Sequence, residues 1–242
     1  MVEISVVAPC LNEESNIDEL IVRTLKIFDD NQLSGELILV NDGSIDGTQQ
    51  LLDEYSLKFH NVKAVHHEEN KGITESWASG LDVSVGKYVV TIDADMQYQP
   101  EDILQLYNAM VSSNCDLVQG WRSKCKGNED QREIMSKTLS WMLNAIVGTS
   151  MPDIKSGFVL YKKNVFKDIL GERKKYLTFQ HFFLLYAIKK DYCIERVPIV
   201  FHERHGGTSF IKNAFLFSCK VLYDLPRAII EYNAFGRKRR KQ

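Results

Sequence analysis

Short runs rich in valine, isoleucine and leucine alternate with segments of helical periodicity through the first half of this chain. The short runs cover residues 4–8, 37–40, 62–65, 88–92 and 117–119, and the helical segments cover residues 17–28, 48–58, 73–85 and 101–113. Such alternation is typical of a parallel sheet covered by helices. We therefore predict an α/β fold.

The second half of the chain departs from this alternation. A charged, irregular stretch at 123–130 is followed by a helix at 132–147, a strand at 158–161, a helix at 179–189 and a strand at 195–200. In open α/β sheets, ligands bind at the loops beyond the carboxyl ends of the strands. Functional residues are therefore expected in those loops, or in the segments that fold over them.

Residues 210–225 have the pattern of an amphipathic helix. A helical projection places Lys212, Asn213, Lys220 and Asp224 on an arc of about 120°, with apolar side chains around the rest. Such a wide apolar face fits either a helix packed on the core or one lying in a membrane interface. The basic run at 237–241 favours membrane contact, because anionic lipids attract such tails. We therefore predict a domain at 1–209 and an amphipathic segment with a basic tail at 210–242.

Charge and cysteine content argue against several classes of protein. The chain has 242 residues, and its 30 basic and 32 acidic residues give a net charge of −2, which provides no electrostatic reason to bind nucleic acid. The five cysteines are spread out without a Cys-x-x-Cys pair, so we expect free thiols in a reducing compartment. We find neither a signal-peptide pattern nor an apolar stretch of roughly 18 to 20 residues, so we expect a chain that does not cross a bilayer.

An acidic motif follows the apolar run at 88–92. Asp93 and Asp95 are two residues apart, so in extended backbone they point the same way and can share one hard divalent cation with diphosphate oxygens. Gln97 could add a neutral oxygen. For an isolated Asp-x-Asp motif, a solvated acidic turn is the commoner explanation, so the context has to decide.

Two further polar turns supply that context. Residues 41–48, with sequence Asn-Asp-Gly-Ser-Ile-Asp-Gly-Thr, follow the second predicted strand, and residues 9–13 follow the first. Their carboxylates and amides offer acceptors for a base and for ribose hydroxyls, while Gly43 and Gly47 permit tight turns. Turn formation alone explains 41–48 equally well. Three polar strand ends in one sheet favour a nucleotide cleft.

Five segments, taken in order, resemble the family 2 glycosyltransferases. They are residues 6–13, 40–48, 70–72, 93–102 and 153–158. The similarity runs from about residue 4 to residue 209 and is closest to the branch of dolichol-phosphate mannosyltransferases and polyprenyl-phosphate glycosyltransferases. It implies a GT-A (Rossmann-like) fold, a mostly parallel sheet flanked by helices, followed here by the C-terminal amphipathic segment.

The resemblance also implies roles for individual residues. The nucleoside would contact Pro9, Leu11, Glu13, Val40 and Asp42. Asp93, Asp95 and Gln97 would hold Mg²⁺ or Mn²⁺ on the donor diphosphate, and Ala94 belongs to the same donor-binding set. The lipid phosphate would be bound by Arg122, Arg132 and Ser136, in keeping with the bidentate binding of phosphate by guanidinium groups. For Arg132 and Ser136 the alternative is an ordinary helix surface.

Two more residues complete the implied site. Asp153 matches the position of a general base in the wider family, although a phosphate acceptor needs no proton removed and Asp153 would then orient groups; its alternative role is a turn cap. Arg204 resembles an arginine that contacts the donor diphosphate or the acceptor phosphate from a mobile loop. The chain departs from the branch at Phe210, where lysine is frequent, and at Asn41, where aspartate is frequent.

These features predict a metal-dependent, inverting hexosyltransferase. It would move a sugar from a GDP- or UDP-linked donor to a polyprenyl or dolichyl phosphate, at the cytosolic face of a membrane as a peripheral protein. Self-association or an integral-membrane partner subunit would fit such a location. One alternative is transfer to a sugar hydroxyl of a glycan or glycolipid. Another is a sugar nucleotidyltransferase, which needs a glycine-rich basic loop after the first strand that residues 9–13 do not provide.

Overall fold

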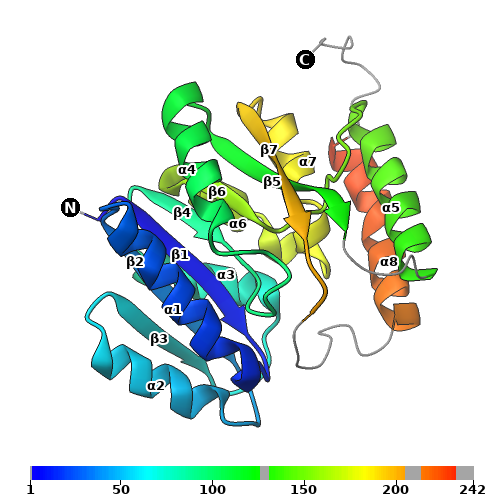
Figure 1. The fold of residues 1–242 in the computed structure, drawn as a ribbon. Helices are drawn as coiled ribbons and strands as arrows, with labels where there is room; N and C mark the ends of the chain where they lie inside the picture. The colour runs from blue at the N-terminus through cyan, green and yellow to red at the C-terminus, as the bar shows by residue number, and fades with distance from the viewer. Residues whose placement is uncertain (1, 126–130, 205–213, 233–242) are drawn as a thin grey trace.

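The computed structural model describes residues 2–125, 131–204 and 214–232. Its centre is a seven-stranded sheet with the strand order β3-β2-β1-β4-β6-β5-β7 (Figure 1). The strands are β1 (Ile4–Cys10), β2 (Gly35–Asp42), β3 (Val62–His67), β4 (Tyr88–Thr91), β5 (Leu117–Cys125), β6 (Val159–Lys162) and β7 (Ile194–Phe201). β6 runs antiparallel to β4 and β5, and the other pairs are parallel. The predicted α/β fold is confirmed.

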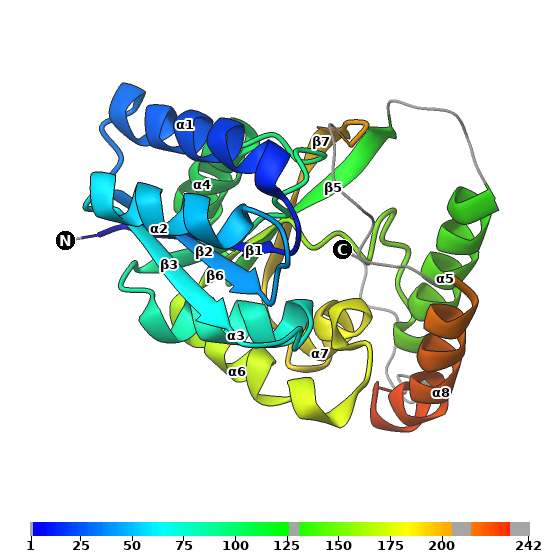
Figure 2. The same cartoon turned by 90° about the horizontal axis from the view of Figure 1, so that it is seen from below.

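Helices cover both faces of the sheet (Figure 2). One face packs on α1 (Glu14–Asp30), α2 (Thr48–Lys58) and α4 (Asp102–Ser113). The other packs on α3 (Ile73–Val83), α6 (Lys163–Gly171) and α7 (Phe183–Lys189), with the short 3₁₀ helices η1 (Arg173–Lys175) and η2 (Phe179–His181) beside them. Alternate side chains of β1 point to opposite faces of the sheet: Val6 packs in the layer with α1, α2 and α4, and Val7 in the layer with α3, α6 and α7. Because both faces of the strand are buried, its apolar run is continuous.

Two further helices lie side by side beyond the sheet, α5 (Gln131–Val147) and α8 (Ala214–Tyr232). α8 buries Val221, Leu225, Ala228 and Tyr232 at helical spacing against the core. The helix extends beyond residues 210–225, the range in which the sequence has the amphipathic pattern. It continues through Pro226, because packing of Ala228 and Tyr232 offsets the hydrogen bond that proline cannot donate.

The amphipathic arc of α8 also differs from its prediction. Asp224, assigned to the polar arc, is buried, and its carboxylate accepts hydrogen bonds from the backbone N–H groups of Leu177 and Thr178 and from the Thr178 hydroxyl. Leu222 and Tyr223 are instead exposed. In the three described ranges, no helix combines the length and the apolar character needed to span a membrane. The division of the chain at residue 209 stays a prediction.

Two local expectations were wrong. β5 continues to Cys125, so the start of the stretch predicted to be irregular is strand; its pairing with β7 satisfies the backbone, with a register shift between Arg122 and Lys124. Cys115 and Cys193, predicted to be free thiols, are joined by a disulfide bond. Cys115 precedes β5 and Cys193 precedes β7, and these two strands are parallel neighbours. The Cα atoms of the two cysteines are therefore 4.9 Å apart, although 78 residues separate them in the sequence.

Candidate functional site

The polar turns after β1 and β2 lie against each other. The backbone N–H of Asn12 donates to the Ser44 hydroxyl at 2.9 Å, and the Asn12 side-chain oxygen accepts from the N–H of Ile45 at 2.9 Å. The N–H of Glu13 donates to the Thr48 hydroxyl at 2.9 Å. These contacts follow from the parallel pairing of β1 with β2, which puts Cys10 opposite Asn41 and brings both strand ends to one edge.

Asp42 is fully buried at the end of β2. Its carboxylate accepts the backbone N–H groups of Lys71 at 2.8 Å and Gly72 at 2.9 Å, and it contacts Nδ1 of His67 at 2.7 Å. Gly72 has a φ of 91°, which few residues other than glycine adopt, so the turn depends on it. Asp42 therefore fixes the segment 70–72 beside the sheet edge. His67 was not selected from the sequence.

Glu13 is the buried carboxylate at the end of β1. Burial raises its pKa to about 7, against the opposing effects of the Asn16 hydrogen bond and the Arg204 charge. Pro9 and Val40 are paired in the β1–β2 register and are buried, and Leu11 follows β1 half-buried. All residues predicted to contact the nucleoside thus lie at two adjacent strand ends.

Asp93 and Asp95 follow β4 at the same edge of the sheet. Burial, together with the charge of Asp95, raises the pKa of Asp93 to about 7, and burial likewise raises the pKa of Asp95. One oxygen of Asp95 accepts the N–H of Gln97 at 3.1 Å, and Ala94 between the two carboxylates is buried. The side-chain nitrogen of Gln97 donates to the carbonyl of His202 at 3.1 Å. The negative charges of these two crowded carboxylates are poorly solvated by water. A bound cation would stabilise both charges.

Arg204 connects the first and fourth strand ends. Its Nη2 donates to Oδ2 of Asp95 at 2.6 Å, and its Nη1 donates to Oε1 of Glu13 at 3.3 Å. The segment that carries it is held over the acidic motif by the N–H of His202, which donates to the Gln97 carbonyl at 2.9 Å. A positive charge from the end of β7 thus lies against the carboxylates from β1 and β4.

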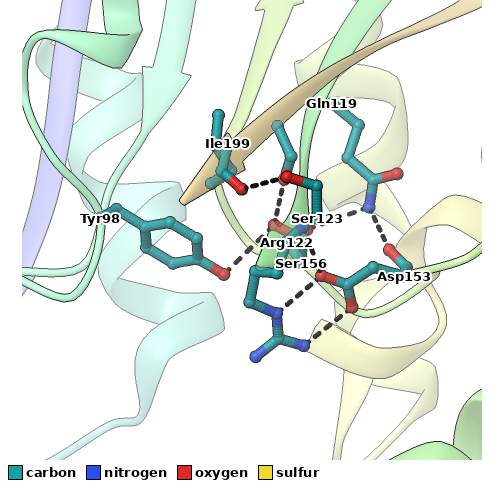
Figure 3. Close-up of polar contacts among 8 residues, drawn as sticks. Tyr98, Gln119, Arg122, Ser123, Asp153, Ser156 and Ile199 are labelled. Atoms are coloured by element: carbon teal, nitrogen blue, oxygen red, sulfur yellow. Dashed lines mark hydrogen bonds and ion pairs between the residues drawn. The ribbon is translucent and has the colours of Figure 1, made fainter. Parts of the chain in front are cut away.

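Arg122 and Asp153 form a bidentate ion pair (Figure 3). Nε of Arg122 donates to Oδ2 of Asp153 at 2.6 Å, and Nη2 donates to Oδ1 at 2.8 Å. The backbone N–H of Arg122 adds a third bond at 3.1 Å, and its guanidinium lies 5.0 Å from the ring centre of Phe201. Burial acts to raise the pKa of Asp153, but these bonds and the Arg122 charge outweigh it and lower the pKa. Asp153 is therefore a stable anion and a weak proton acceptor.

The loop that follows Asp153 is fastened to the sheet. The hydroxyl of Ser156 contacts the Tyr98 hydroxyl at 3.1 Å and donates to the Gly120 carbonyl at 2.5 Å (Figure 3). Gln119 donates to the Asp153 carbonyl at 2.8 Å. Lys155 lies within this loop and was not selected from the sequence, although the motif 153–158 contains it.

The predicted acceptor-phosphate residues are only partly described. Arg132 and Ser136 belong to α5, but their side chains lie outside the described residues, as do residues 205–213 and 233–242. Their roles stay predictions. Within the described ranges, no three histidine, cysteine, aspartate or glutamate side chains are grouped so as to hold a metal ion. The candidate cation site after β4 therefore contains two carboxylate ligands, those of Asp93 and Asp95.

Comparison with known proteins gives consistent similarities. The sequence model of the family described as glycosyl transferase family 2 matches residues 5–170. A dodecaprenyl-phosphate galacturonate synthase of Rhizobium johnstonii is 28% identical over 92% of this chain. Undecaprenyl-phosphate 4-deoxy-4-formamido-L-arabinose transferases of Proteus mirabilis and Pectobacterium atrosepticum are 30% and 32% identical over 92% of it. The chain spans 65 to 66% of the length of these relatives.

Solved structures of the same architecture are more distant in sequence. A glucosyl-3-phosphoglycerate synthase from Mycobacterium tuberculosis, in complex with Mn²⁺, UDP-glucose and phosphoglyceric acid, has a TM-score of 0.70 at 20% identity, covering 94% of this chain and 80% of that one. TarS 1-349 of S. aureus in complex with UDP-GlcNAc has a TM-score of 0.68 at 20% identity, covering 96% and 66%. These likenesses confirm the predicted GT-A fold.

Proposed function

The chain belongs to glycosyl transferase family 2, and from this premise we propose that it transfers a sugar from a GDP- or UDP-linked donor to the phosphate of a polyprenyl or dolichyl lipid. The relatives whose names specify dodecaprenyl or undecaprenyl phosphate support a lipid phosphate as acceptor. The donor is a nucleotide-sugar, in keeping with the nucleotide-bound neighbours.

The ion pair of Arg122 with Asp153 is the observation that favours a lipid phosphate over a sugar hydroxyl as the acceptor. Transfer to a hydroxyl requires a base that takes its proton, whereas a phosphate monoester has a second pKa of about 6 and arrives mostly as a dianion. Asp153 has a lowered pKa and gives both carboxylate oxygens to Arg122. Such a carboxylate is suited to orienting the guanidinium, which then binds and positions the acceptor phosphate.

The donor set at the end of β4 fits a hard divalent cation. Carboxylate and amide oxygens are the ligands that Mg²⁺ and Mn²⁺ prefer, and diphosphate oxygens usually complete the coordination. We propose that Asp93, Asp95 and Gln97 hold the ion. When bound, it neutralises the charge that develops on the departing diphosphate.

The protein's own residues complete the reaction in this proposal. Glu13 and the turn held by Asp42 bind the nucleoside, and Arg204 exchanges its bond to Asp95 for a diphosphate oxygen. Arg122, together with Arg132 and Ser136, holds the acceptor phosphate. One phosphate oxygen then attacks the anomeric carbon from the face opposite the diphosphate. Inversion at that carbon follows from a single displacement.

A donor and acceptor panel tests the proposal. The protein is incubated with GDP- and UDP-sugars, Mg²⁺ or Mn²⁺, and a short polyprenyl phosphate, and nucleoside diphosphate release is measured with and without the lipid. Acceptor-stimulated release with at least one donor is expected. If release is stimulated by free sugars or glycolipids and never by the lipid phosphate, the hydroxyl-acceptor alternative replaces the proposal.

Peripheral contact with the cytosolic face of a membrane is part of the same proposal. The described part of α8 packs one face on the core and exposes Leu222, Tyr223 and Ile230 on the other, and the basic run 237–241 follows it. Apolar side chains beside basic residues are typical of segments that lie in a membrane interface. An oligomer or a membrane-embedded partner subunit would strengthen that contact.

Deleting residues 237–242 is expected to weaken binding to anionic vesicles by roughly three orders of magnitude at low salt, since the five basic residues contribute about 1 kcal/mol each near the surface. The melting temperature should change little. Co-sedimentation with vesicles containing phosphatidylserine measures the effect, and a variant with glutamine at 237–241 is the matched control for length. Equal sedimentation of all three proteins at low salt would remove the tail from the proposal.

A further inference from the structure

Arg204 bridges two carboxylates that belong to different halves of the proposed donor site. Its Nη2 donates to Oδ2 of Asp95 at 2.6 Å, and its Nη1 donates to Oε1 of Glu13 at 3.3 Å. Asp95 is proposed to hold the cation, and Glu13 to bind the nucleoside. In the protein alone, one guanidinium therefore links a residue from each half of the site that the donor has to enter.

Both carboxylate oxygens of Asp95 accept hydrogen bonds from the protein itself. Oδ1 accepts the backbone N–H of Gln97 at 3.1 Å, and Oδ2 accepts the guanidinium of Arg204. The first bond comes from a neutral group and does not oppose a cation, whereas the second brings a full positive charge to the oxygen. A divalent ion on the same carboxylate would be repelled by that charge. The ion and the guanidinium therefore compete for Asp95.

The positive charge of Arg204 acts on the entire acidic group. Burial raises the pKa of Glu13, Asp93 and Asp95, and the charge of Arg204 opposes this effect at each of the three. A bound divalent ion would oppose it in the same sense and more strongly. The guanidinium thus stabilises the same carboxylates that the ion is proposed to stabilise.

The guanidinium can leave these carboxylates without disturbing the sheet edge. The Arg204 side chain is 26% exposed, against 7% for Asp95 and 9% for Glu13. The backbone nearby is fixed separately, since the N–H of His202 donates to the Gln97 carbonyl at 2.9 Å and the Gln97 side-chain nitrogen donates to the His202 carbonyl at 3.1 Å. Rotation about its own side-chain bonds is therefore enough for Arg204 to change partners.

A nucleoside diphosphate provides an alternative partner for both positive charges. Its phosphate oxygens are bound bidentately by guanidinium groups and are coordinated by hard divalent ions. With a diphosphate present, the ion can take Asp95 while Arg204 takes a phosphate oxygen. An ion alone brings no anion in exchange, so the bond between Arg204 and Asp95 would be lost without compensation.

Building on the proposed function, we propose that Arg204 makes the binding of the divalent cation depend on the nucleoside diphosphate. The guanidinium occupies the cation-binding carboxylate until a diphosphate engages it, so the ion and the nucleotide bind cooperatively and the ion alone binds weakly. Because such coupling is reciprocal, the ion raises nucleotide affinity by the same factor. The protein then retains its metal ion only while the donor or the diphosphate product is bound.

Arg204→Gln is expected to change two affinities in opposite directions. Without nucleotide, the variant should bind Mn²⁺ about 10- to 100-fold more tightly than the parent, since the competing charge-assisted hydrogen bond is gone. At saturating Mn²⁺, it should bind UDP or GDP about 10- to 100-fold more weakly, since the diphosphate loses its guanidinium. The paramagnetic resonance signal of free Mn²⁺ measures the first affinity, and calorimetry measures the second. A purely structural role for Arg204 would weaken both.

Two variants serve as controls. Arg204→Lys keeps the charge without the bidentate geometry and should give smaller shifts of both affinities in the same directions, which also keeps the comparison available if Arg204→Gln does not fold without metal. Arg196→Gln removes an exposed arginine of β7 and should change neither affinity. In thermal unfolding, Mn²⁺ should stabilise Arg204→Gln at lower concentrations than it stabilises the parent.

The outcome separates this inference from the proposed function. A Mn²⁺ affinity of both Arg204 variants that is equal to that of the parent within twofold, or weaker, overturns the inference even if the parent shows acceptor-stimulated release. Failure of the proposed function is a different result, namely the absence of such release by the parent. If parent and variants alike bind no Mn²⁺, with or without nucleotide, the inference and the metal assignment are both wrong.

Discussion

Asp95→Ala is expected to abolish sugar transfer while leaving the protein folded. The substitution removes one of the two carboxylates proposed to hold the cation that neutralises the departing diphosphate. Burial raises the pKa of Asp95, which means that its ionised form is less favourable in the folded protein than in water. Its loss should therefore cost little stability beyond its bonds to Arg204 and to the backbone N–H of Gln97.

Three measurements check this expectation. Nucleoside diphosphate release should be undetectable for Asp95→Ala, and a chelator should have the same effect on the parent. Mn²⁺ should raise the melting temperature of the parent and not of the variant, since an ion that binds only the folded state stabilises it. Glu54→Ala, at an exposed position of α2, is the control for loss of one acidic residue. A folded Asp95→Ala protein with near-parent activity would show that the metal assignment is wrong.

Arg122→Ala is expected to lower kcat/KM for the acceptor about 10- to 100-fold. It removes a charge-assisted hydrogen bond to the acceptor phosphate, worth roughly 1.5 to 3 kcal/mol. It also leaves Asp153 buried without its partner, so the melting temperature should fall. Arg122→Lys separates the two effects, because it retains the charge while losing the bidentate geometry. Donor affinity should stay near that of the parent in both variants.

Asp153→Asn should be less damaging than Arg122→Ala with a lipid phosphate acceptor, because no proton has to be removed before attack. An amide oxygen can still accept one bond from Arg122. Initial rates at saturating donor and varied polyprenyl phosphate compare the variants directly, with Arg132→Ala as a second test of acceptor binding. An inactive Asp153→Asn protein beside an Arg132→Ala protein of parent activity would favour the hydroxyl acceptor instead.

The sequence was sufficient for those parts of the site that depend on strand ends. Asp42 and Asp93 each follow an apolar run, and parallel strands bring their carboxyl ends to one edge, so pattern and spacing predicted their convergence. The fold followed from the same alternation. The grouping of side chains within one turn could be predicted from neighbouring residues in the sequence alone.

Long-range pairings could not be predicted in the same way. Arg122 and Asp153 are 31 residues apart, and their bond depends on how β6 returns antiparallel between β4 and β5. Cys115 and Cys193 meet because β7 pairs with β5, which no spacing rule indicates.

The bonds of Arg204 have a consequence for the order of folding. This arginine reaches Glu13 across 191 residues and Asp95 across 109 residues of sequence. Contacts of such separation form late, because the entropy of closing a long loop must be overcome first. During synthesis, β1 to β4 emerge and can associate well before the segment after β7 leaves the ribosome. Until then the carboxylates at the strand ends lack their arginine, so a nascent chain would carry a strongly acidic sheet edge that becomes balanced only when the segment after β7 has been made.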